Sequence, residues 1–105
     1  MMQSLTDCYT LENGVKIPCL GFGTWKAPDG DVAKASVLAA LECGYRHIDT
    51  ASAYRNEASV GRGIQESGLK REELFITTKL NNPVCGYRES MEAFEESMEK
   101  LQLEY

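Results

Sequence analysis

The 105-residue chain lacks long apolar runs, low-complexity tracts and blocks of one charge. Its longest apolar run, residues 37–41, is far shorter than the ~20 residues that a helix needs to cross a bilayer. The first seven residues contain neither a basic stretch nor an apolar one, which argues against a signal peptide. We therefore expect a cytoplasmic protein with no membrane partner.

Basic clusters and metal-ligand spacings are missing as well. Eleven basic residues face sixteen acidic ones, and the net charge is −5. Nucleic-acid binding requires a basic face that neutralises phosphates, so no nucleic-acid partner is expected. The four cysteines form no C-x-x-C pair and are accompanied by one histidine, which argues against a metal site. Reduced thiols are expected instead.

Strand and helix patterns alternate along the chain. Asn13-Gly14 between two apolar segments predicts a β-hairpin with a type I′ turn. Capping residues and glycines then delimit helices between short apolar strands, with Asp29 or Asp31 capping the first helix and Asn56 the second. The elements expected after the hairpin are a strand at 20–24, a helix to about 43, a strand at 47–50, a helix at 57–67, a strand at 74–78 and a final helix.

The final helix has a clear apolar stripe. Met91, Phe94, Met98 and Leu101 recur at intervals of three and four residues, which places them on one helical face. Such a stripe is usually buried in the core, and we expect that here. The spacing of Glu96 and Lys100 predicts an ion pair on the solvent side.

The β, α, β, α, β, α order predicts a parallel α/β sheet. A doubly wound dinucleotide-binding domain would need G-x-G-x-x-G after the first strand, but Gly21-Phe22-Gly23 continues as Thr24-Trp25-Lys26. A (β/α)8 barrel is therefore favoured, and such a barrel takes about 250 residues. Residues 1–105 would supply the hairpin and about three βα units of one barrel domain, with no second domain.

Three ionisable residues lie where strands of a parallel sheet end. Asp49 ends the second strand, Tyr54 follows in the next loop, and Lys79 ends the third strand. An ammonium beside a tyrosine favours the phenolate, and an aspartate steadies the ammonium, so the group resembles a tuned general acid. A structural ion pair beside a surface tyrosine explains the same spacing, and at this level both readings stay open.

Longer motifs extend around these residues. The segment Gly44-Tyr45-Arg46-His47-Ile48-Asp49-Thr50-Ala51, followed by Glu57 and Val60-Gly61, is similar to the signature of the aldo-keto reductases. The segments 20–25, 53–57 and 71–80 resemble further blocks of that family in register, so the resemblance covers most of the chain. The resemblance is greatest to the prokaryotic-type branch, which reduces keto sugars, keto acids and small aldehydes.

The resemblance implies a set of catalytic roles. Tyr54 would be the general acid that protonates the oxygen of a small-molecule carbonyl substrate. Lys79 would make Tyr54 a better acid, and Asp49 would hold Lys79. His47 and Glu57 would be structural.

The resemblance also implies a cofactor site. NADPH would bind in extended form at the C-terminal end of the barrel, close to Gly23, Thr24 and Asp49. Trp25 would form one wall of the substrate pocket. The early hairpin would plug the opposite end of the barrel.

Two departures from the family pattern stand out. Asn81 occupies a place where this branch commonly has a pocket tryptophan. The family's fourth catalytic residue, a histidine after the fourth strand, and the segments that grip the rest of the cofactor fall outside these 105 residues. The chain alone is therefore expected to be inactive. The alternatives are a non-catalytic nucleotide-binding or accessory protein on the same fold, or a truncated product without independent function; the oligomeric state stays open.

Overall fold

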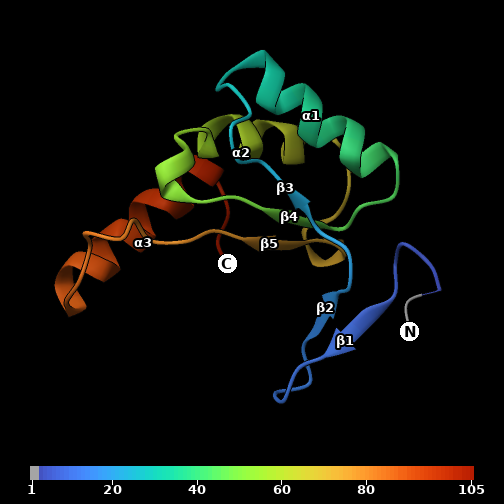
Figure 1. Ribbon diagram of the computed structural model, residues 1–105, viewed down its shortest axis with the longest axis horizontal. Helices are drawn as coiled ribbons and strands as arrows, with labels where there is room; N and C mark the ends of the chain where they lie inside the picture. Colours follow the sequence, from blue (N-terminus) through green and yellow to red (C-terminus); the bar gives the residue numbers. More distant parts are fainter. Residues whose placement is uncertain (1–2) are drawn as a thin grey trace.

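Three short parallel strands form the central sheet of the protein: β3 (Phe22–Gly23), β4 (His47–Asp49) and β5 (Phe75–Thr77), in the order β3-β4-β5 (Figure 1). The computed structural model describes residues 3–105. Gly23 lies opposite Asp49, which in turn lies opposite Thr77. Because the strands are parallel, their C-terminal ends meet at one edge, as the alternating sequence pattern predicts.

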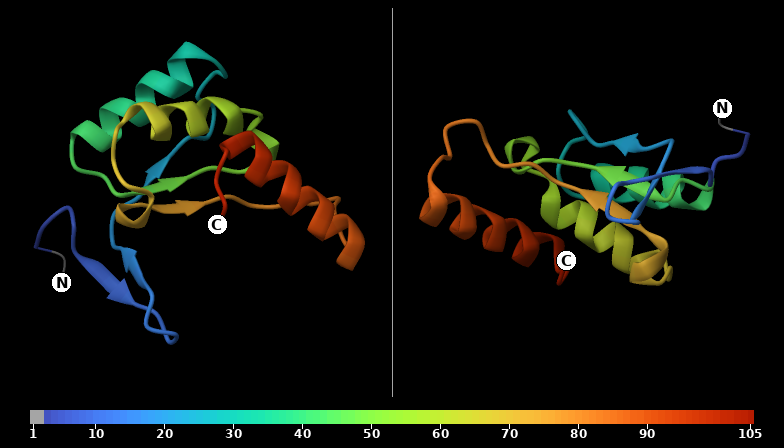
Figure 2. Two further views of the ribbon diagram at one scale, coloured as in Figure 1. Left: turned by 180° about the vertical axis from the view of Figure 1, so that it is seen from behind. Right: turned by 90° about the horizontal axis from the view of Figure 1, so that it is seen from below.

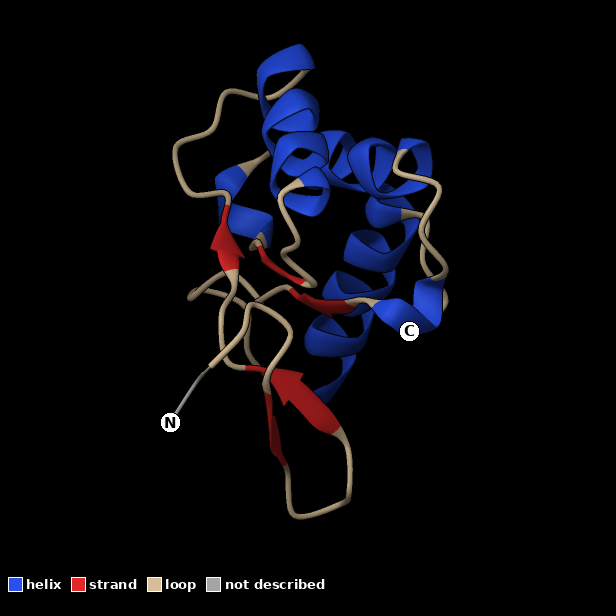
Figure 3. Ribbon diagram, turned by 90° about the vertical axis from the view of Figure 1, so that its right-hand side faces the viewer, coloured by secondary structure: helices blue, strands red, loops and turns tan. Residues whose placement is uncertain are grey.

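The helices gather on one side of these strands (Figure 3). They are α1 (Asp31–Glu42), α2 (Glu57–Glu66) and α3 (Tyr87–Leu101), with two 3-10 turns, η1 (Ser52–Tyr54) and η2 (Arg71–Glu73). In both views of Figure 2, α3 lies beside α2 on the β5 side of the sheet. Three βα units thus follow one another across an open sheet, and the strands do not close into a barrel within residues 3–105.

The core lies between the helices and the facing side of the sheet. Ile48 at the centre of β4 is fully buried and points to the helices, so its neighbours His47 and Asp49 point to the opposite face. The buried apolar side chains that pack together are Val37, Ala40, Leu41, Ile48, Val60, Ile64, Leu74 and Leu101. The helix-facing side of the sheet therefore supplies the packing, and the other side is available for the polar groups.

The N-terminal hairpin forms as expected, but its turn differs from the prediction. Strand β1 (Cys8–Thr10) pairs antiparallel with β2 (Lys16–Pro18). The Gly14 amide donates to the Leu11 carbonyl at 2.8 Å, and Gly14 has a φ of 86° whereas Asn13 does not have a positive φ. The prediction of a type I′ turn was therefore wrong, because both central residues of that turn need a positive φ. The loop is a three-residue hairpin connection that ends at Gly14.

The helix starts also differ from the expected side-chain caps. Gly30, and neither Asp29 nor Asp31, is the N-cap of α1. The Asp29 carboxylate instead accepts a hydrogen bond from the Ser59 hydroxyl at 2.5 Å. Asn56 is the N-cap of α2 as predicted, but its side chain makes no capping bond. The side chains of Asp29 and Asn56 form hydrogen bonds with residues distant in the sequence and do not cap the helices.

The stripe on α3 is only partly buried. Leu101 is 1% exposed, whereas Met91 and Phe94 are 43% and 47% exposed. The expected core role is confirmed for Leu101 and wrong for Met91 and Phe94, because no further layer covers that part of the helix within residues 3–105. The predicted ion pair forms, with Lys100 Nζ 3.0 Å from Glu96 Oε1.

Other expectations concern classes of site. No helix in the described part of the chain is long and apolar enough to cross a membrane. Across residues 3–105, no group of histidine, cysteine or acidic side chains is arranged to hold a metal ion. The four cysteines are free thiols, three of them exposed.

Candidate active site

Lys79, two residues beyond β5, is the centre of a polar cluster at the C-terminal edge of the sheet. Its ammonium donates hydrogen bonds to the Asp49 carboxylate, to the Thr50 carbonyl oxygen at 3.0 Å and to the Tyr54 hydroxyl oxygen at 3.3 Å. The same Nζ lies 5.1 Å from the centroid of the Tyr54 ring. The three side chains singled out in the sequence are therefore in direct contact.

The parallel ladder explains why Lys79 reaches this place. Beyond the regular strands, the Thr50 amide donates to the Thr77 carbonyl at 2.8 Å, and the Ser52 amide donates to the Lys79 carbonyl at 3.1 Å. Pairing thus continues two residues past the end of β5 and three residues past the end of β4. Because side chains alternate along an extended chain, Thr77 and Lys79 project on the same face as Asp49.

Tyr54 is held by a tight turn. It ends the 3-10 helix η1, and its amide donates to the Ala51 carbonyl at 3.1 Å. The next residue, Arg55, adopts a left-handed conformation with a φ of 58°, and Asn56 follows as the N-cap of α2. This reversal keeps the phenol beside the end of β5, where Lys79 is found.

The charge on Lys79 is favoured by its partners. Burial by itself lowers the pKa of Lys79, but the hydrogen bonds to Asp49 and Tyr54 together outweigh it and raise that pKa above the usual value. The side chains of Lys79 and Asp49 are 46% and 39% exposed, so this ion pair adds little to stability. Its effect is local, because it presents a fixed positive charge to the Tyr54 oxygen.

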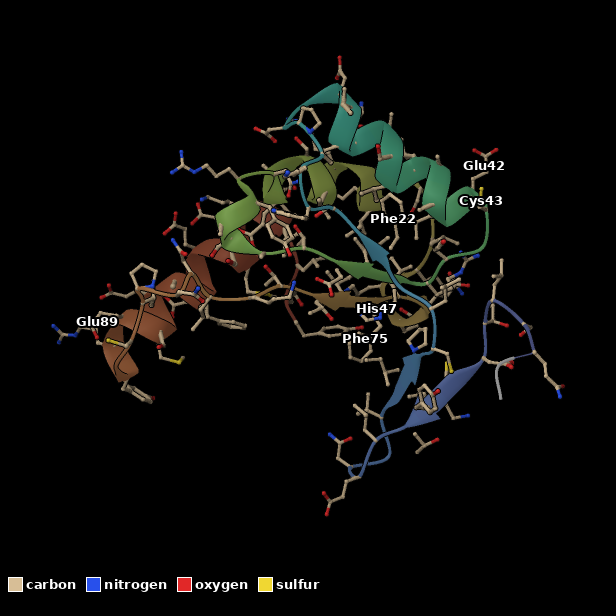
Figure 4. The ribbon with its side chains drawn as sticks, in the orientation of Figure 1. Phe22, Glu42, Cys43, His47, Phe75 and Glu89 are labelled. Atoms are coloured by element: carbon tan, nitrogen blue, oxygen red, sulfur yellow. The ribbon has the colours of Figure 1, made fainter. Side chains whose placement is uncertain are left out.

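The only histidine of the sequence, His47, lies two residues before Asp49 on β4 and projects from the same face of the sheet as Asp49. His47 Nε2 is 2.8 Å from the Thr77 hydroxyl, and its ring packs edge-on against Phe75. Figure 4 labels His47 and Phe75 next to each other. Burial lowers the pKa of His47 below its usual value, although the nearby Asp49 opposes this. Its surroundings therefore favour the neutral form of the ring, which is held by packing against Phe75 and by its hydrogen bond to Thr77.

Three of the residues expected to face cofactor and substrate, Gly23, Thr24 and Trp25, lie at the end of β3 and directly after it. A Cβ on Gly23 would have no atom within 4 Å. The backbone of Gly23, opposite Asp49, is therefore not covered by other side chains. Thr24 is 1% exposed, and its hydroxyl donates inward to the Thr50 hydroxyl at 2.9 Å. Trp25 is 68% exposed and lies under the Lys26 ammonium, 4.8 Å away. The contacts that join Asp49, Tyr54 and Lys79 do not extend to Trp25.

Sequence reasoning missed a buried network around Asn56. The Asn56 side chain is 1% exposed; its amide donates to the carbonyls of Thr24 at 2.9 Å and Ala27 at 3.1 Å, and its Oδ1 accepts from the Thr50 hydroxyl at 3.0 Å. The network ties the loop after β3 to the turn that carries Tyr54. The sequence offered one signal, an asparagine two residues after Tyr54, and that signal was taken for a helix cap.

Comparison with known proteins identifies the family to which this cluster belongs. The sequence pattern of the Aldo/keto reductase family matches residues 19–105. The chain belongs to the aldo/keto reductase family. The resemblance inferred from the signature around Asp49 and Tyr54 is thereby confirmed.

Individual relatives of this aldo/keto reductase chain are substantially longer. It is 52% identical over 105 residues to the "Glyoxal reductase" of Bacillus subtilis, covering all of this chain and 38% of the relative. It is 47% identical over 100 residues to the "Glycerol 2-dehydrogenase (NADP(+))" of Saccharomyces cerevisiae, covering 95% of this chain and 31% of the relative. The chain thus spans about two fifths or less of the length of these relatives.

Solved structures match the fold closely. An aldo/keto reductase from Brucella melitensis superposes with a TM-score of 0.91 at 43% identity, covering all of this chain and 40% of that one. A Bombyx mori aldo-keto reductase in complex with NADP superposes with a TM-score of 0.88 at 38% identity, covering 98% and 36%. The expected fold class is confirmed: these residues form part of a (β/α)8 barrel.

Proposed function

We propose that the barrel to which these residues belong reduces aldehydes or ketones, including keto sugars and keto acids, to alcohols with NADPH, and that Tyr54 is its general acid. The observation that carries the proposal is the Lys79 ammonium, which contacts both the Asp49 carboxylate and the Tyr54 hydroxyl. Two relatives support the cofactor, since one is named as an NADP(+) dehydrogenase and the other was solved with NADP. Another relative is named for glyoxal, a small carbonyl compound.

The residues at the edge of the sheet fit such a cofactor. Gly23 leaves bare backbone where a flat ring can approach, and the half-exposed Asp49 carboxylate opposite it can accept hydrogen bonds from ribose hydroxyls. Gly23, Thr24 and Asp49 are the residues that we propose to hold the nicotinamide end. Thr24 would contribute through its place beside Asp49, because its hydroxyl is already bonded inside the protein.

Residues of this chain would supply the proton that the carbonyl oxygen takes up during reduction. A nicotinamide held at Gly23, Thr24 and Asp49 would supply hydride for the carbonyl carbon, and negative charge would then develop on the carbonyl oxygen. Tyr54 donates its hydroxyl proton to that oxygen, and the Lys79 ammonium stabilises the phenolate that remains. Asp49 keeps the ammonium directed at Tyr54 and balances its charge.

The substrate would lie between Tyr54 and side chains of the surrounding loops. Trp25 is exposed at the end of β3 and supplies an apolar wall. Asn81, exposed beyond β5, replaces the tryptophan common in this branch. This difference would alter one side of the proposed substrate pocket.

We propose that residues 1–105 by themselves do not turn over substrate. The sheet is open, and the segments that in this family complete the cofactor site are not among these residues. Oxidation of NADPH by the purified chain with a simple aldehyde would contradict this.

A chimera provides the test of the catalytic roles. Residues 1–105 replace the matching part of the Bacillus subtilis glyoxal reductase, to which all 105 positions align. We expect NADPH-dependent reduction of glyoxal, followed by the fall in NADPH absorbance. In this chimera Tyr54→Phe should lower kcat by about 10² to 10⁴-fold, because the proton donor is lost, while the Kd for NADPH, measured by fluorescence quenching, barely changes.

Tyr87→Phe is the matched control, since Tyr87 is 85% exposed at the first residue of α3, and the activity of this variant should equal that of the parent. A Tyr54→Phe chimera that retains full turnover would refute the general-acid role. An inactive parent chimera that binds NADPH normally would favour a non-catalytic nucleotide-binding protein.

A further inference from the structure

Glu57 is a buried carboxylate outside the Asp49, Tyr54 and Lys79 cluster. It is the first residue of α2 and only 3% exposed. The amides at a helix N-terminus favour negative charge, but a carboxylate is rarely buried without a specific partner. Its partner is the Thr78 hydroxyl, which donates to Glu57 Oε2 at 2.6 Å.

Thr78 is the residue immediately before Lys79. Strand β5 ends at Thr77, so the peptide that carries Lys79 lies past the regular sheet. On one side, the Lys79 carbonyl accepts hydrogen bonds from the Ser52 amide at 3.1 Å and the Ser52 hydroxyl at 3.0 Å. The bond from Thr78 to Glu57 adds a second anchor, from a different element.

Glu57 is also connected to Tyr54 by a short segment of the chain. The residues between them are a left-handed turn at Arg55 and the buried Asn56, which leave the segment little freedom. The contact that the segment must maintain is a long one, since Lys79 Nζ and the Tyr54 oxygen are 3.3 Å apart. Hydrogen bonds weaken steeply beyond this length, so a displacement of a few tenths of an ångström would lose the contact.

We propose that Glu57, acting through the Thr78 hydroxyl, is a positioning residue that holds Lys79 against Tyr54 and Asp49. This inference rests on the proposed function, because a fixed position of the Lys79 ammonium matters most if Tyr54 releases a proton. The buried Glu57 and the half-buried Thr78 together link the turn that carries Tyr54 to the end of β5. They take no part in the proton transfer themselves.

The test measures how available the Lys79 amine is, with no cofactor or substrate present. The purified chain is treated with limiting acetic anhydride at a concentration where sedimentation shows it to be monomeric, and acetylation is quantified at each lysine by mass spectrometry. Thr78→Val removes the hydroxyl at constant shape, and we expect acetylation of Lys79 to become about fivefold faster or more, because its hydrogen bonds are loosened. Lys16, exposed on β2, serves as the internal reference and should not change.

Two conservative variants are the matched controls. Thr78→Ser keeps the donor and Glu57→Gln keeps an acceptor, so both should retain the parent rate at Lys79. The double variant Glu57→Met with Thr78→Val is decisive, because replacing both partners of a buried bond by apolar groups avoids an unpaired carboxylate. It should fold and still show the faster rate.

An unchanged Lys79 rate in the double variant would overturn the proposal. Loss of its fold would overturn it too, because the pair would then serve the fold as a whole. These outcomes do not depend on turnover in the chimera, so failure of the proposed reductase activity is distinguishable from failure of the positioning role.

Discussion

At the scale of single residues, the cluster depends on one lysine that serves three acceptors. An ammonium is a compact charge on a flexible stem, and here it reaches a carboxylate, a backbone carbonyl and a phenol at once. Asp49 and Tyr54 raise the pKa of Lys79 despite partial burial. The positive charge that Tyr54 experiences is therefore constant across neutral pH.

His47 offers a pH-dependent test at the residue scale. Burial holds its pKa below 6.5 in the folded chain, so the unfolded chain binds the proton more readily. The contribution of His47 to stability is complete above about pH 6.5 and should be lost as the pH falls through its lowered pKa. We expect the free energy of unfolding in urea to decline more between pH 7.5 and 5 in the parent than in His47→Asn.

The comparison with His47→Asn is the control for the acidic residues, because both proteins contain the same ones. Because His47 is the only histidine, the difference between the two curves isolates one ring. Parallel curves for parent and variant would show that the buried ring is not destabilised by protonation.

At the scale of elements, the contact between α2 and α3 depends on a glycine. A Cβ on Gly61 would lie 2.4 Å from the Leu101 carbonyl oxygen, closer than side chains approach backbone. Gly61 costs α2 some helix propensity, and the close approach of the two helices compensates. Packing therefore explains why a glycine lies within α2.

Gly61→Ala should destabilise the chain although alanine favours helices. Since the clash is with backbone, α3 must shift, and we expect a loss of about 1–3 kcal/mol in the free energy of unfolding, measured in urea by circular dichroism. Gly23→Ala is the matched control, because nothing lies within 4 Å of a Cβ there and its φ is not positive. A Gly61→Ala chain at least as stable as the parent would contradict the packing argument.

At the scale of the whole molecule, residues 3–105 leave one side of β5 and part of α3 uncovered. A groove of about 350 Å³ runs between them, lined in part by Ile76, Leu80, Phe94 and Met98. β3 and β5 are both edge strands of the open sheet. Exposed strand edges and apolar grooves promote association.

We expect the isolated 105-residue chain to self-associate through this groove. Phe94→Glu places a charge in it and should shift the sedimentation profile towards monomer at micromolar concentrations, because burying the charge is costly. Val32→Glu is the matched control: Val32 is 55% exposed on α1, away from the groove, and this change should leave the profile as it is. A monomeric parent chain would contradict the expectation.

Much of this architecture was accessible from the sequence. Alternating apolar strands and capped helices gave the parallel order, and Gly44 and Gly68 follow α1 and α2 with positive φ as helix-ending glycines do. Asp49 and Lys79 were recognisable as neighbours because the ends of adjacent parallel strands must meet. These features depend on local conformation and on the geometry of the sheet, which short-range patterns encode.

What only the tertiary structure decided are the contacts between segments distant in the chain. Thr78 reaches Glu57, Asn56 reaches the loop after β3, and Asp29 reaches Ser59 instead of capping a helix. A polar side chain has several suitable partners nearby, and burial selects among them, because an unpaired polar group in the interior costs more than a lost cap. The sequence by itself determined which residues could form the site, and packing determined which of them hold it in place.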